Sequence, residues 1–372
     1  MDPEKLLQSL SLKEKLFQMF ILGFSGTEFN KENENIRKAI KSGLGGVILF
    51  SENIDSYDQT ARLTESLRKT ASIPLFISID QEGGRVERTG NIKNKIKYLS
   101  AGELAAMGNN EYARIQAEAI SQELNYMGCN MNFAPVMDVN TNENNPIIGI
   151  RAFGSNSEKV MEYAAVFYKT FIQNSIIPVV KHFPGHGPTE EDSHLTMPYV
   201  GLSCKELEAT HIKPFKKALQ DGVNAVMISH VHFRCFNTDA VPASLSKEVV
   251  TGYLRQKLGF NGLVISDDMV MGGVQNYYSG FEACMKGINA GIDVFIYRNS
   301  TDETIKIIED LCKVVNKGDL SEKRINESVK RILLCKKKSG LWKKSPVKTV
   351  FKPEELQKKL DKIISNYSGA EK

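Results

Sequence analysis

The 372-residue chain lacks the features that mark membrane-bound, exported and nucleic-acid-binding proteins. Its longest apolar runs are strand-sized, which leaves no candidate membrane span. The N-terminus, Met1–Lys5, has no basic region followed by an apolar stretch, so no export signal is visible. Basic and acidic residues are nearly balanced, 48 against 44, and much of the excess sits in Lys336–Lys338 and Lys343–Lys344. Such clusters are typical of a solvated surface, and we predict no nucleic-acid and no membrane partner.

Cysteine is also scarce. The six cysteines lie at least 23 residues apart, and none belongs to a CxxC or CxxH pair. This pattern is typical of reduced thiols that fill a core in a reducing compartment. The sequence therefore predicts unpaired cysteines and, with the absent export signal, a cytoplasmic location.

What the chain does contain is a regular alternation of apolar strand-like runs and segments of helical period. The strands are predicted at residues 19–23, 46–50, 75–80, 130–135, 176–181, 225–230, 262–267 and 292–296. The helices are predicted at residues 56–70, 101–127, 157–174, 203–219, 246–258 and 281–289, and a capping box at Ser11–Glu14 opens an earlier one. Near-continuous Val/Ile-rich strands separated by helices favour a parallel sheet, and eight of them favour an α/β fold closed into a (β/α)8 TIM barrel.

No Pro/Ser-rich linker or break in composition divides the chain before its end. We therefore predict a single TIM-barrel domain over residues 1–342 and a basic C-terminal tail over residues 343–372. Residues 301–339 are expected to form two surface helices as a helical extension, the second capped by Ser321 and ending near Gly340.

The segment Lys181–His194 is where we expect the chemistry. It holds three of the six histidines and begins where a predicted buried strand ends, which is the reactive end of such a barrel. The spacing of His182, His186 and His194 matches no zinc motif such as HExxH, so we predict no metal. The turn at Phe183–Gly185 excludes a helix. His186 therefore either takes part in the chemistry or only holds its loop in place by hydrogen bonds.

Within this segment, Asp192-Ser193-His194 places a carboxylate two residues from an imidazole. A carboxylate so placed can hold the imidazole in one tautomer and make it a proton donor and acceptor near neutral pH. The alternative is a pair of surface residues that never meet. A hydrolytic triad with Ser193 as nucleophile is disfavoured, because no Gly-x-Ser-x-Gly elbow surrounds it.

Other predicted strands also end in polar residues, among them Asp80, Asp138, His230 and the pair Asp267-Asp268. In a barrel these ends converge on one mouth. Asp267 is the candidate nucleophile toward an electrophilic carbon. The loop from Asp80 to Arg88 is interpreted as a rim that binds polyols or carboxylates. A phosphate-binding loop is the alternative, but neither GxGxxG nor GxxxxGK[ST] is present.

Together these blocks resemble glycoside hydrolase family 3, and within it the β-N-acetylglucosaminidases that act on peptidoglycan fragments. The motif Lys-His-Phe-Pro-Gly-His-Gly, four variable residues and Asp-Ser-His is complete from Lys181 to His194. Further similar segments are residues 79–86, 132–138, 151–154 and 266–271, so the resemblance covers roughly residues 10–340. One departure is Pro188, where these enzymes often carry Asp, and we expect it to alter loop stiffness.

The resemblance implies roles for particular residues. Asp267 would form a covalent glycosyl-enzyme, and His194, paired with Asp192, would be the general acid/base. The residues that would hold N-acetylglucosamine are Asp80, Arg88, Arg151, Lys181 and His182. The resemblance also implies a cis bond at Phe183–Pro184.

The implied reaction is retaining hydrolysis, without a cofactor, of terminal N-acetylglucosamine from muropeptides of the GlcNAc-anhydroMurNAc or GlcNAc-MurNAc type. One alternative is an N-acetylglucosaminide phosphorylase that uses the same residues. A β-glucosidase of the same family is a second, although such enzymes generally take their acid/base from another domain and lack the Asp-Ser-His loop. A non-catalytic sugar-binding barrel is the third.

Overall fold

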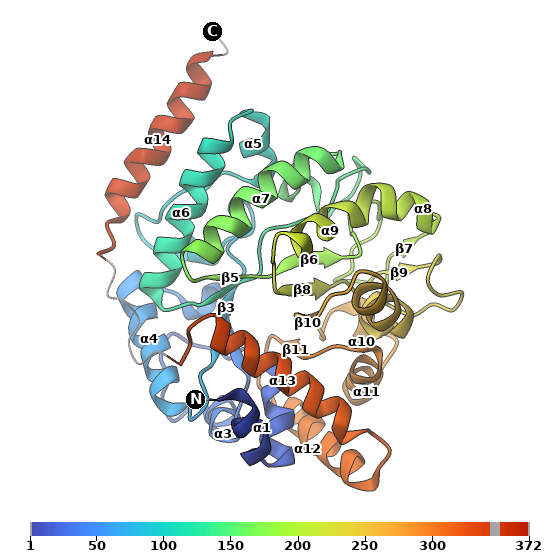
Figure 1. Ribbon diagram of the computed structural model, residues 1–372. Coiled ribbons are helices and arrows are strands. Elements are labelled where there is room, and N and C mark those ends of the chain that lie inside the picture. The colour runs from blue at the N-terminus through green and yellow to red at the C-terminus, as the bar shows by residue number, and fades with distance from the viewer. Residues whose placement is uncertain (1, 343–349, 371–372) are drawn as a thin grey trace.

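The computed structural model describes residues 2–342 and 350–370, and most of them form a closed parallel barrel (Figure 1). Its strands are β1 (Phe20–Leu22), β2 (Gly46–Leu49), β3 (Phe76–Ile79), β4 (Met131–Asn132), β5 (Ile177–Pro178), β6 (Val180–Phe183), β8 (Ala225–Ile228), β10 (Leu263–Asp268) and β11 (Val294–Tyr297). The sheet order is β5-β4-β3-β2-β1-β11-β10-β8-β6, and every pair is parallel. Only Val179 separates β5 from β6, so the sheet begins and ends on two halves of one strand. The predicted eight-stranded (β/α)8 barrel is confirmed.

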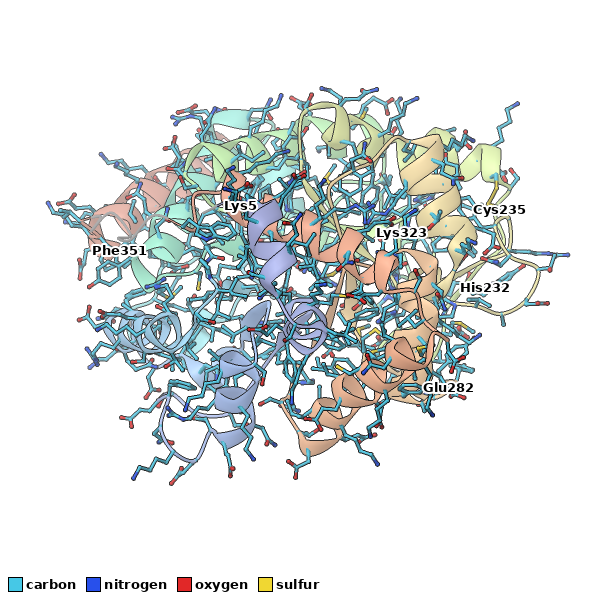
Figure 2. The ribbon with its side chains drawn as sticks, turned by 60° about the horizontal axis from the view of Figure 1, so that its bottom comes forward. Lys5, His232, Cys235, Glu282, Lys323 and Phe351 are labelled. Carbon is cyan, nitrogen blue, oxygen red and sulfur yellow. A yellow bond between two sulfur atoms is a disulfide. The ribbon has the colours of Figure 1, made fainter. Side chains whose placement is uncertain are left out.

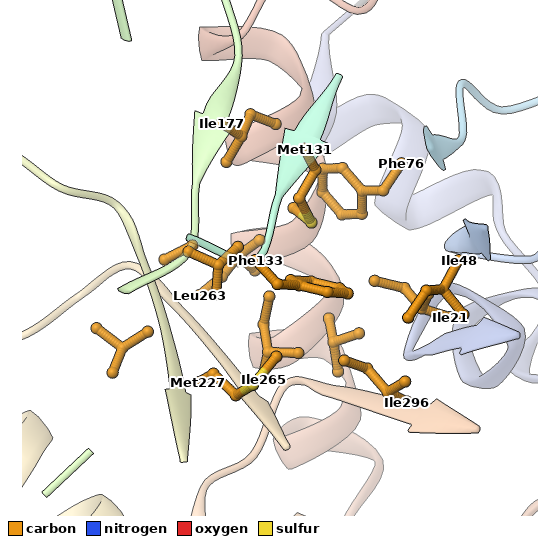
Figure 3. Close-up of a cluster of buried hydrophobic side chains, with 14 of the residues drawn as sticks. Ile21, Ile48, Phe76, Met131, Phe133, Ile177, Met227, Leu263, Ile265 and Ile296 are labelled. Carbon is orange, nitrogen blue, oxygen red and sulfur yellow. The ribbon is translucent and has the colours of Figure 1, made fainter. Parts of the chain in front are cut away.

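Apolar side chains fill the inside of the barrel (Figure 3). Every strand of the sheet except β6 contributes a labelled member of this cluster, and these include Ile21, Ile48, Phe76, Met131, Ile177, Met227, Ile265 and Ile296. All of these are buried. Burying one such side chain contributes about 1.5–3 kcal/mol. The lumen is thus a packed core, which leaves the strand ends as the place for polar chemistry.

Helices surround the strands as predicted, with one clear correction. Residues 101–127 form two helices, α5 (Ala101–Ala106) and α6 (Asn110–Met127), and not one. Gly108 has a φ of +65°, which ends the first helix, and the Asn109 side chain accepts a hydrogen bond from the backbone N–H of Glu111 to start the second.

The remaining helices before the last strand are α1 (Pro3–Ser9), α2 (Leu12–Gln18), α3 (Glu34–Lys41), α4 (Tyr57–Thr70), α7 (Ser157–Gln173), α8 (Cys204–Leu207), α9 (Lys213–Gln220), α10 (Gly272–Gln275) and α11 (Gly280–Ala290). Most of them lie where helices were predicted, and the capping box at Ser11 is confirmed. Two stretches within predicted helices are π-helical, Glu208–Ile212 and Glu248–Lys257. The short helices α1, α3 and α10 were not predicted. In the described part of the chain no helix combines the length and apolarity that crossing a bilayer requires.

After the last strand come the two predicted helices, α12 (Asp302–Lys317) and α13 (Glu322–Lys338), with Ser321 capping the second. The expectation that Lys336 lies on a solvated face is wrong. Its side chain is buried, Nζ donates a 2.8 Å hydrogen bond to Gln18 Oε1, and Nζ lies 4.9 Å from the centre of the Phe76 ring. Burial lowers the pKa of Lys336 to about 7.

The predicted basic tail includes helix α14 (Pro353–Ala370), which packs against α6 through Leu356, Leu360 and Ile363 (Figure 1). Phe351, just before this helix, lies against the rings of Tyr57 and Tyr126. Residues 343–349, with Lys343 and Lys344, lie outside the described residues. A boundary at residue 342 therefore stays a prediction.

The cysteines are only partly as predicted. Cys129, Cys284 and Cys335 are free and buried, but Cys204 and Cys235 form a disulfide. This bond joins the segments after β7 (Tyr199–Val200) and β9 (His232–Phe233), which pair in a separate two-stranded sheet. It lies on the opposite side of the molecule from Phe351 (Figure 2). The prediction that all cysteines are unpaired is wrong, because a separation of 31 residues in sequence does not reveal this contact.

Candidate active site

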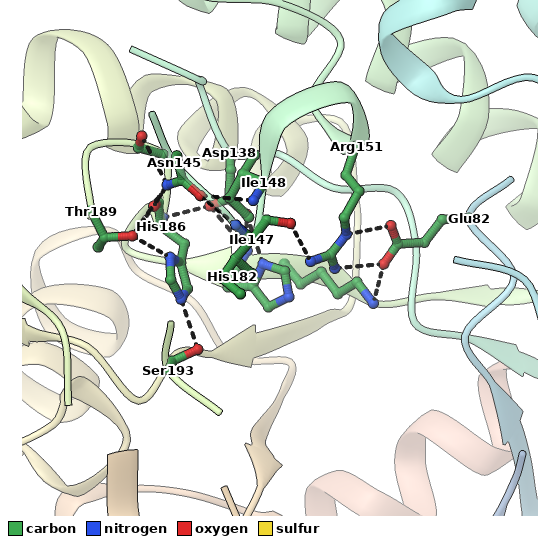
Figure 4. A network of polar contacts seen from close by, with 12 residues as sticks. Glu82, Asp138, Asn145, Ile147, Ile148, Arg151, His182, His186, Thr189 and Ser193 are labelled. Atoms are coloured by element: carbon green, nitrogen blue, oxygen red, sulfur yellow. Dashed lines mark hydrogen bonds and ion pairs between the residues drawn. The ribbon is translucent and has the colours of Figure 1, made fainter. Parts of the chain in front are cut away.

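An ion cluster lies where β3 and β6 end. Lys181 Nζ lies 2.8 Å from Asp80 Oδ1 and 2.7 Å from Glu82 Oε1. Arg88 lies 3.0 Å from the other Asp80 oxygen. Arg151 aligns with both oxygens of Glu82, Nε at 2.9 Å and a terminal nitrogen at 2.8 Å (Figure 4). Three cations thus enclose two carboxylates, which leaves one net positive charge at the barrel mouth.

The charges of this cluster control its acidity. Burial alone would raise the pKa of Glu82, but Arg151 and Lys181 outweigh it and hold that pKa at about 2. Asp80 is affected in the same way, since Lys181 and Arg88 overcome the effect of burial and hold its pKa well below the ordinary value. Both carboxylates are therefore ionised and can accept hydrogen bonds from a ligand.

Removing Lys181 is expected to destabilise the fold. A Lys181→Met variant leaves Asp80 and Glu82 with one cation fewer in a buried setting, and we expect a loss of about 3–5 kcal/mol of unfolding free energy at pH 7. Because the folded-state pKa of Glu82 is depressed, its pairing stabilises the fold above about pH 4.5 and loses that effect as the pH falls toward 2. Urea unfolding at pH 7 and melting temperatures from pH 7 to 3 measure both effects. Between pH 7 and pH 3, the melting temperature of Lys181→Met should fall less than that of the wild type.

The matched control is Lys213→Met, which breaks the exposed ion pair with Glu158. Because both partners are exposed to solvent, its unfolding free energy should stay close to that of the wild type. Equal unfolding free energies for Lys181→Met and wild type at pH 7 would contradict the proposed strength of the cluster.

His182 is oriented by a buried carboxylate beneath it. Its Nδ1 lies 2.7 Å from Asp138 Oδ2, and Asp138 also accepts the backbone N–H of His186 at 2.6 Å. The contact keeps Nδ1 as the donor and frees Nε2 to face the barrel mouth. The Lys181–His182 and Phe183–Pro184 peptide bonds are both cis, so the cis bond implied at Phe183–Pro184 is confirmed.

The side chain of His186 holds its loop in place by two hydrogen bonds. Its Nδ1 lies 2.9 Å from Thr189 Oγ1 and its Nε2 lies 2.9 Å from Ser193 Oγ (Figure 4). Burial lowers the pKa of His186 to about 4, so the ring is neutral at physiological pH. Asn145 binds the same loop through His186 O, Gly187 O and Thr189 Oγ1.

These contacts bear on the Ser193 triad that the sequence disfavoured. The partner of His186 Nδ1 is a hydroxyl and not a carboxylate, so Ser193 and His186 have no third member of a triad. Across residues 2–342 and 350–370, no three His, Cys, Asp or Glu side chains gather as a metal site would require.

Asp192 and His194 do meet, a point that the sequence left open. Asp192 Oδ1 accepts the backbone N–H of His194 at 2.7 Å and lies 2.8 Å from its Nδ1. The His194 side chain is 60% exposed, and in the described structure it makes no hydrogen bond to Asp267 or to the ion cluster. Its backbone is anchored nonetheless, since Gly272 and Gly273 donate 3.0 Å hydrogen bonds to His194 O and Ser193 O. These glycines closely follow β10, whose last two residues are Asp267 and Asp268.

A methyl group at position 272 should therefore displace the loop. A Cβ on Gly272 would lie 2.5 Å from Leu195 O and 2.7 Å from His194 O, closer than real contacts allow. We expect Gly272→Ala to lower kcat about 10- to 100-fold, because the acid/base is misplaced, with KM changed less than about threefold. The control is Gly252→Ala, whose new Cβ has its nearest neighbour, Lys247 O, at 3.8 Å. A change in KM without a change in kcat for Gly272→Ala would show that the backbone contacts of Gly272 do not position His194.

Asp267 and Asp268 lie at the end of β10, and their pKa values are shifted in opposite directions. Burial acts to raise the pKa of Asp267, but the nearby His182, His230 and Lys181 keep it below its ordinary value. Burial, reinforced by the charge of Asp267, raises the pKa of Asp268 to about 7. Adjacent carboxyl groups whose pKa values are pushed apart are typical of acid and nucleophile assignments.

His230 completes the surroundings of this pair. Its Nε2 lies 3.1 Å from the backbone oxygen of Asp268, and its Nδ1 lies 2.7 Å from Ser244 Oγ. The structure thus gathers Asp80, Arg88, Arg151 and Lys181 in one cluster. His182 is close enough to Asp267 to lower its pKa. Asp192 and His194 pair on the anchored loop. Glu82 was not among the predicted site residues, although it lies in the charged loop after Asp80.

Comparison with known proteins shows the family to which the chain belongs. Residues 11–335 match the model of the glycosyl hydrolase family 3 N-terminal domain. Over 328 residues the chain is 32% identical to a β-hexosaminidase A from Pseudoalteromonas piscicida, covering 79% of this chain but only 53% of that protein. It is 33% identical to a β-hexosaminidase from Tolumonas auensis, covering 78% of this chain and 86% of that protein.

Solved structures show the same relationship. A family 3 β-N-acetylglucosaminidase from Paenibacillus sp. superposes with a TM-score of 0.87 at 35% identity, covering 95% of this chain and 69% of that one. A β-glucoside phosphorylase superposes with a TM-score of 0.85 at 26% identity, covering 98% of this chain and 66% of that one. The chain therefore belongs to glycoside hydrolase family 3, as its motifs predicted, and is a glycoside hydrolase by class.

Proposed function

We propose that this protein is a retaining β-N-acetylglucosaminidase that removes terminal N-acetylglucosamine from muropeptides. The observation that carries the proposal is the combination of an ionised Asp267 at the barrel mouth with an Asp192–His194 pair on a loop anchored just beyond it. The relatives named β-hexosaminidase and β-N-acetylglucosaminidase support this class of substrate.

The chemistry follows from the two groups. Asp267 attacks the anomeric carbon and forms a glycosyl ester, while His194 Nε2 gives its proton to the departing oxygen. His194 is then neutral at Nε2, takes a proton from water, and that water releases the sugar from Asp267. Asp192 holds Nδ1 of His194 throughout, as its 2.8 Å contact allows, and so keeps the ring in one orientation with Nε2 free to exchange the proton.

The ion cluster is suited to hold the sugar. Asp80 is ionised and can accept hydrogen bonds from sugar hydroxyls, while Arg88 Nε is a buried donor without a partner in the described structure. A buried unpaired donor favours a ligand that satisfies it. Lys181, Arg151 and His182 fix the position of these groups and of the subsite floor.

A histidine in place of the usual second carboxylate fits a muropeptide. The lactyl carboxylate of the muramic residue would lie beside the acid/base, and a neutral or cationic group tolerates that anion better than a second carboxylate would. This explanation predicts that His194→Glu loses more activity on a muropeptide than on a neutral aryl glycoside. Equal losses on both substrates would rule it out.

The test of the proposal is the release of N-acetylglucosamine from a GlcNAc-anhydroMurNAc substrate, with the anomer followed by NMR. The proposal predicts that the β-anomer forms first. Initial formation of the α-anomer would exclude a retaining enzyme. An inert protein in this assay and in an aryl N-acetylglucosaminide assay would favour the sugar-binding barrel.

Phosphorolysis is the second candidate, and the structural similarity to a β-glucoside phosphorylase favours it. Phosphate would replace water as the acceptor, and His194 repels that anion less than a carboxylate would. Assays with and without phosphate, with analysis for the sugar 1-phosphate, separate the two reactions.

The predicted cytoplasmic location, and with it a role in cell-wall recycling, is also a proposal. The disulfide between Cys204 and Cys235 counts against it, because disulfides persist mainly in oxidising compartments. Alkylation of thiols in intact cells tests it: six reactive thiols after denaturation favour the cytoplasm, and four favour an oxidising compartment.

A further inference from the structure

Two exposed apolar side chains lie close to the acid/base His194. Leu195, the next residue in the chain, is 73% exposed, and Tyr277, which follows α10, is 50% exposed. Within residues 2–342 and 350–370, six large apolar side chains are at least 45% exposed, and these are two of the six. Apolar groups that face water beside a reactive side chain favour a ligand that covers them. The proposed mechanism gives neither residue a task.

Hydrogen bonds bring the two residues together. The Asn276 side chain donates to Leu195 O at 2.8 Å, and the Tyr277 hydroxyl lies 3.0 Å from Thr196 Oγ1. The same segment begins with α10, whose first two glycines donate to the backbone of the loop between β6 and β7. Leu195 and Tyr277 are therefore held in fixed places next to the imidazole that this loop carries.

The place of the leaving group follows from the two proposed catalytic residues. Asp267 acts on the anomeric carbon and His194 on the departing oxygen, so the two flank the bond that breaks. The sugar that becomes bound to Asp267 lies at the ion cluster, where β3 and β6 end. The leaving group must extend from the departing oxygen past the imidazole and away from that cluster. This path passes Leu195 and Tyr277.

The chemistry of these side chains suits a sugar ring. The faces of a pyranose carry C–H groups, which pack on aromatic and aliphatic side chains while the hydroxyls at the ring edge stay in water. The Tyr277 hydroxyl is bonded to Thr196, so its ring offers a flat apolar surface of fixed orientation. Leu195 adds an aliphatic group with no hydrogen-bonding atom.

We infer that Leu195 and Tyr277 form the subsite for the leaving sugar, which they bind through one face of its ring. The inference rests on the proposed function, since it takes Asp267 as the nucleophile and His194 as the acid. Binding energy from a part of the substrate that does not react is used to orient the bond that does. The two residues would therefore determine which leaving groups the enzyme accepts.

The other end of the loop offers a different place for the leaving group. There Tyr199, which is 51% exposed, borders a hollow of about 420 Å³. The hollow is lined by Pro188, Glu190, Glu191 and residues 199–202. This lining includes neither His194 nor any residue of the segment after β10. A ring bound in the hollow would not contact the acid, which favours the side with Leu195.

The test compares two substrates that both need a proton on the departing oxygen, the disaccharide GlcNAc-anhydroMurNAc and methyl β-N-acetylglucosaminide. For Leu195→Ser and Tyr277→Ala we expect kcat/KM on the disaccharide to fall about tenfold, and on the methyl glycoside to change less than about threefold. Tyr277→Phe keeps the ring and should stay within about threefold of wild type on both substrates.

Two control variants accompany these measurements. Ile172→Ser removes a side chain that is 45% exposed on α7, and Tyr199→Ala removes the ring beside the hollow. Both should follow wild type on both substrates. A loss for Tyr199→Ala that is confined to the disaccharide would place the leaving group in the hollow and overturn the inference.

The remaining outcomes are also decisive. Equal losses on both substrates for Leu195→Ser and Tyr277→Ala would show that these residues only position the loop. If such losses came with a smaller molecular mass in solution, the side chains would serve a contact between two copies of the chain. Either result would overturn the inference, as would unchanged kcat/KM in both variants. A wild-type protein that cleaves neither substrate would overturn the proposed function, and the inference with it.

Discussion

Replacing Asp267 by asparagine is expected to lower kcat by about 10⁴-fold or more, because the covalent intermediate can no longer form. This half-buried carboxylate lies at the end of β10 and is kept ionised by His182, His230 and Lys181. An asparagine has nearly the same shape but almost no nucleophilicity. Steady-state kinetics with an aryl N-acetylglucosaminide measure the loss, and the melting temperature should change little.

The neighbouring carboxyl provides a stringent control. Asp268 accepts hydrogen bonds from the backbone N–H groups of Val270 and Arg298, each at 3.3 Å, and its pKa is raised to about 7. Asp268→Asn should therefore lower kcat only about tenfold. Azide should restore turnover of Asp267→Ala and give the α-glycosyl azide, the product of direct attack on the β-glycoside. Equal losses at the two positions would contradict the assignment of Asp267.

Replacing His194 by alanine is expected to have the second-largest effect, and its size should depend on the leaving group. General acid catalysis contributes about 10²- to 10⁴-fold for a sugar leaving group, whereas a dinitrophenolate departs without a proton. We therefore expect kcat/KM of His194→Ala to fall by that factor on a disaccharide and by less than about tenfold on the dinitrophenyl glycoside.

Asp192→Asn should change activity in the same direction, but less, since the imidazole remains and loses only its 2.8 Å partner. A loss for His194→Ala that is the same on both substrates would show that His194 is not the acid.

The fold could be predicted from the sequence because each strand is a short β-branched run that is buried on both faces, as at residues 46–49 and 225–228. What the sequence did not reveal depends on context. Gly108 breaks a segment whose apolar period continues through it. The short helix α1 precedes the first strand, and α3, between β1 and β2, has only eight residues. Lys336 belongs to a lysine triplet, yet it lies one helical turn beyond the buried Ile332, and that spacing was the available signal for its burial.

The candidate site, too, could be predicted from the sequence only in part. Residues with distinctive chemistry at strand ends, such as Asp80, Lys181 and Asp267, were predicted to converge on one mouth. Their supports were not predicted, because Asn145 and Gly272 act through contacts between segments far apart in the chain. Tyr277 in particular belongs to no motif of the sequence, and only its contact with Thr196 places it beside the loop that carries His194.

The most direct test of the account is mass spectrometry of the protein trapped with a 5-fluoro N-acetylglucosamine donor. The fluorine slows the breakdown of the glycosyl-enzyme, so the intermediate accumulates. The account predicts one added sugar per chain, in the peptide that contains Asp267 and on its carboxylate, and no label in Asp267→Asn. A label on any other residue, or turnover of the donor without a covalent adduct, would contradict the assignment of Asp267 as the nucleophile.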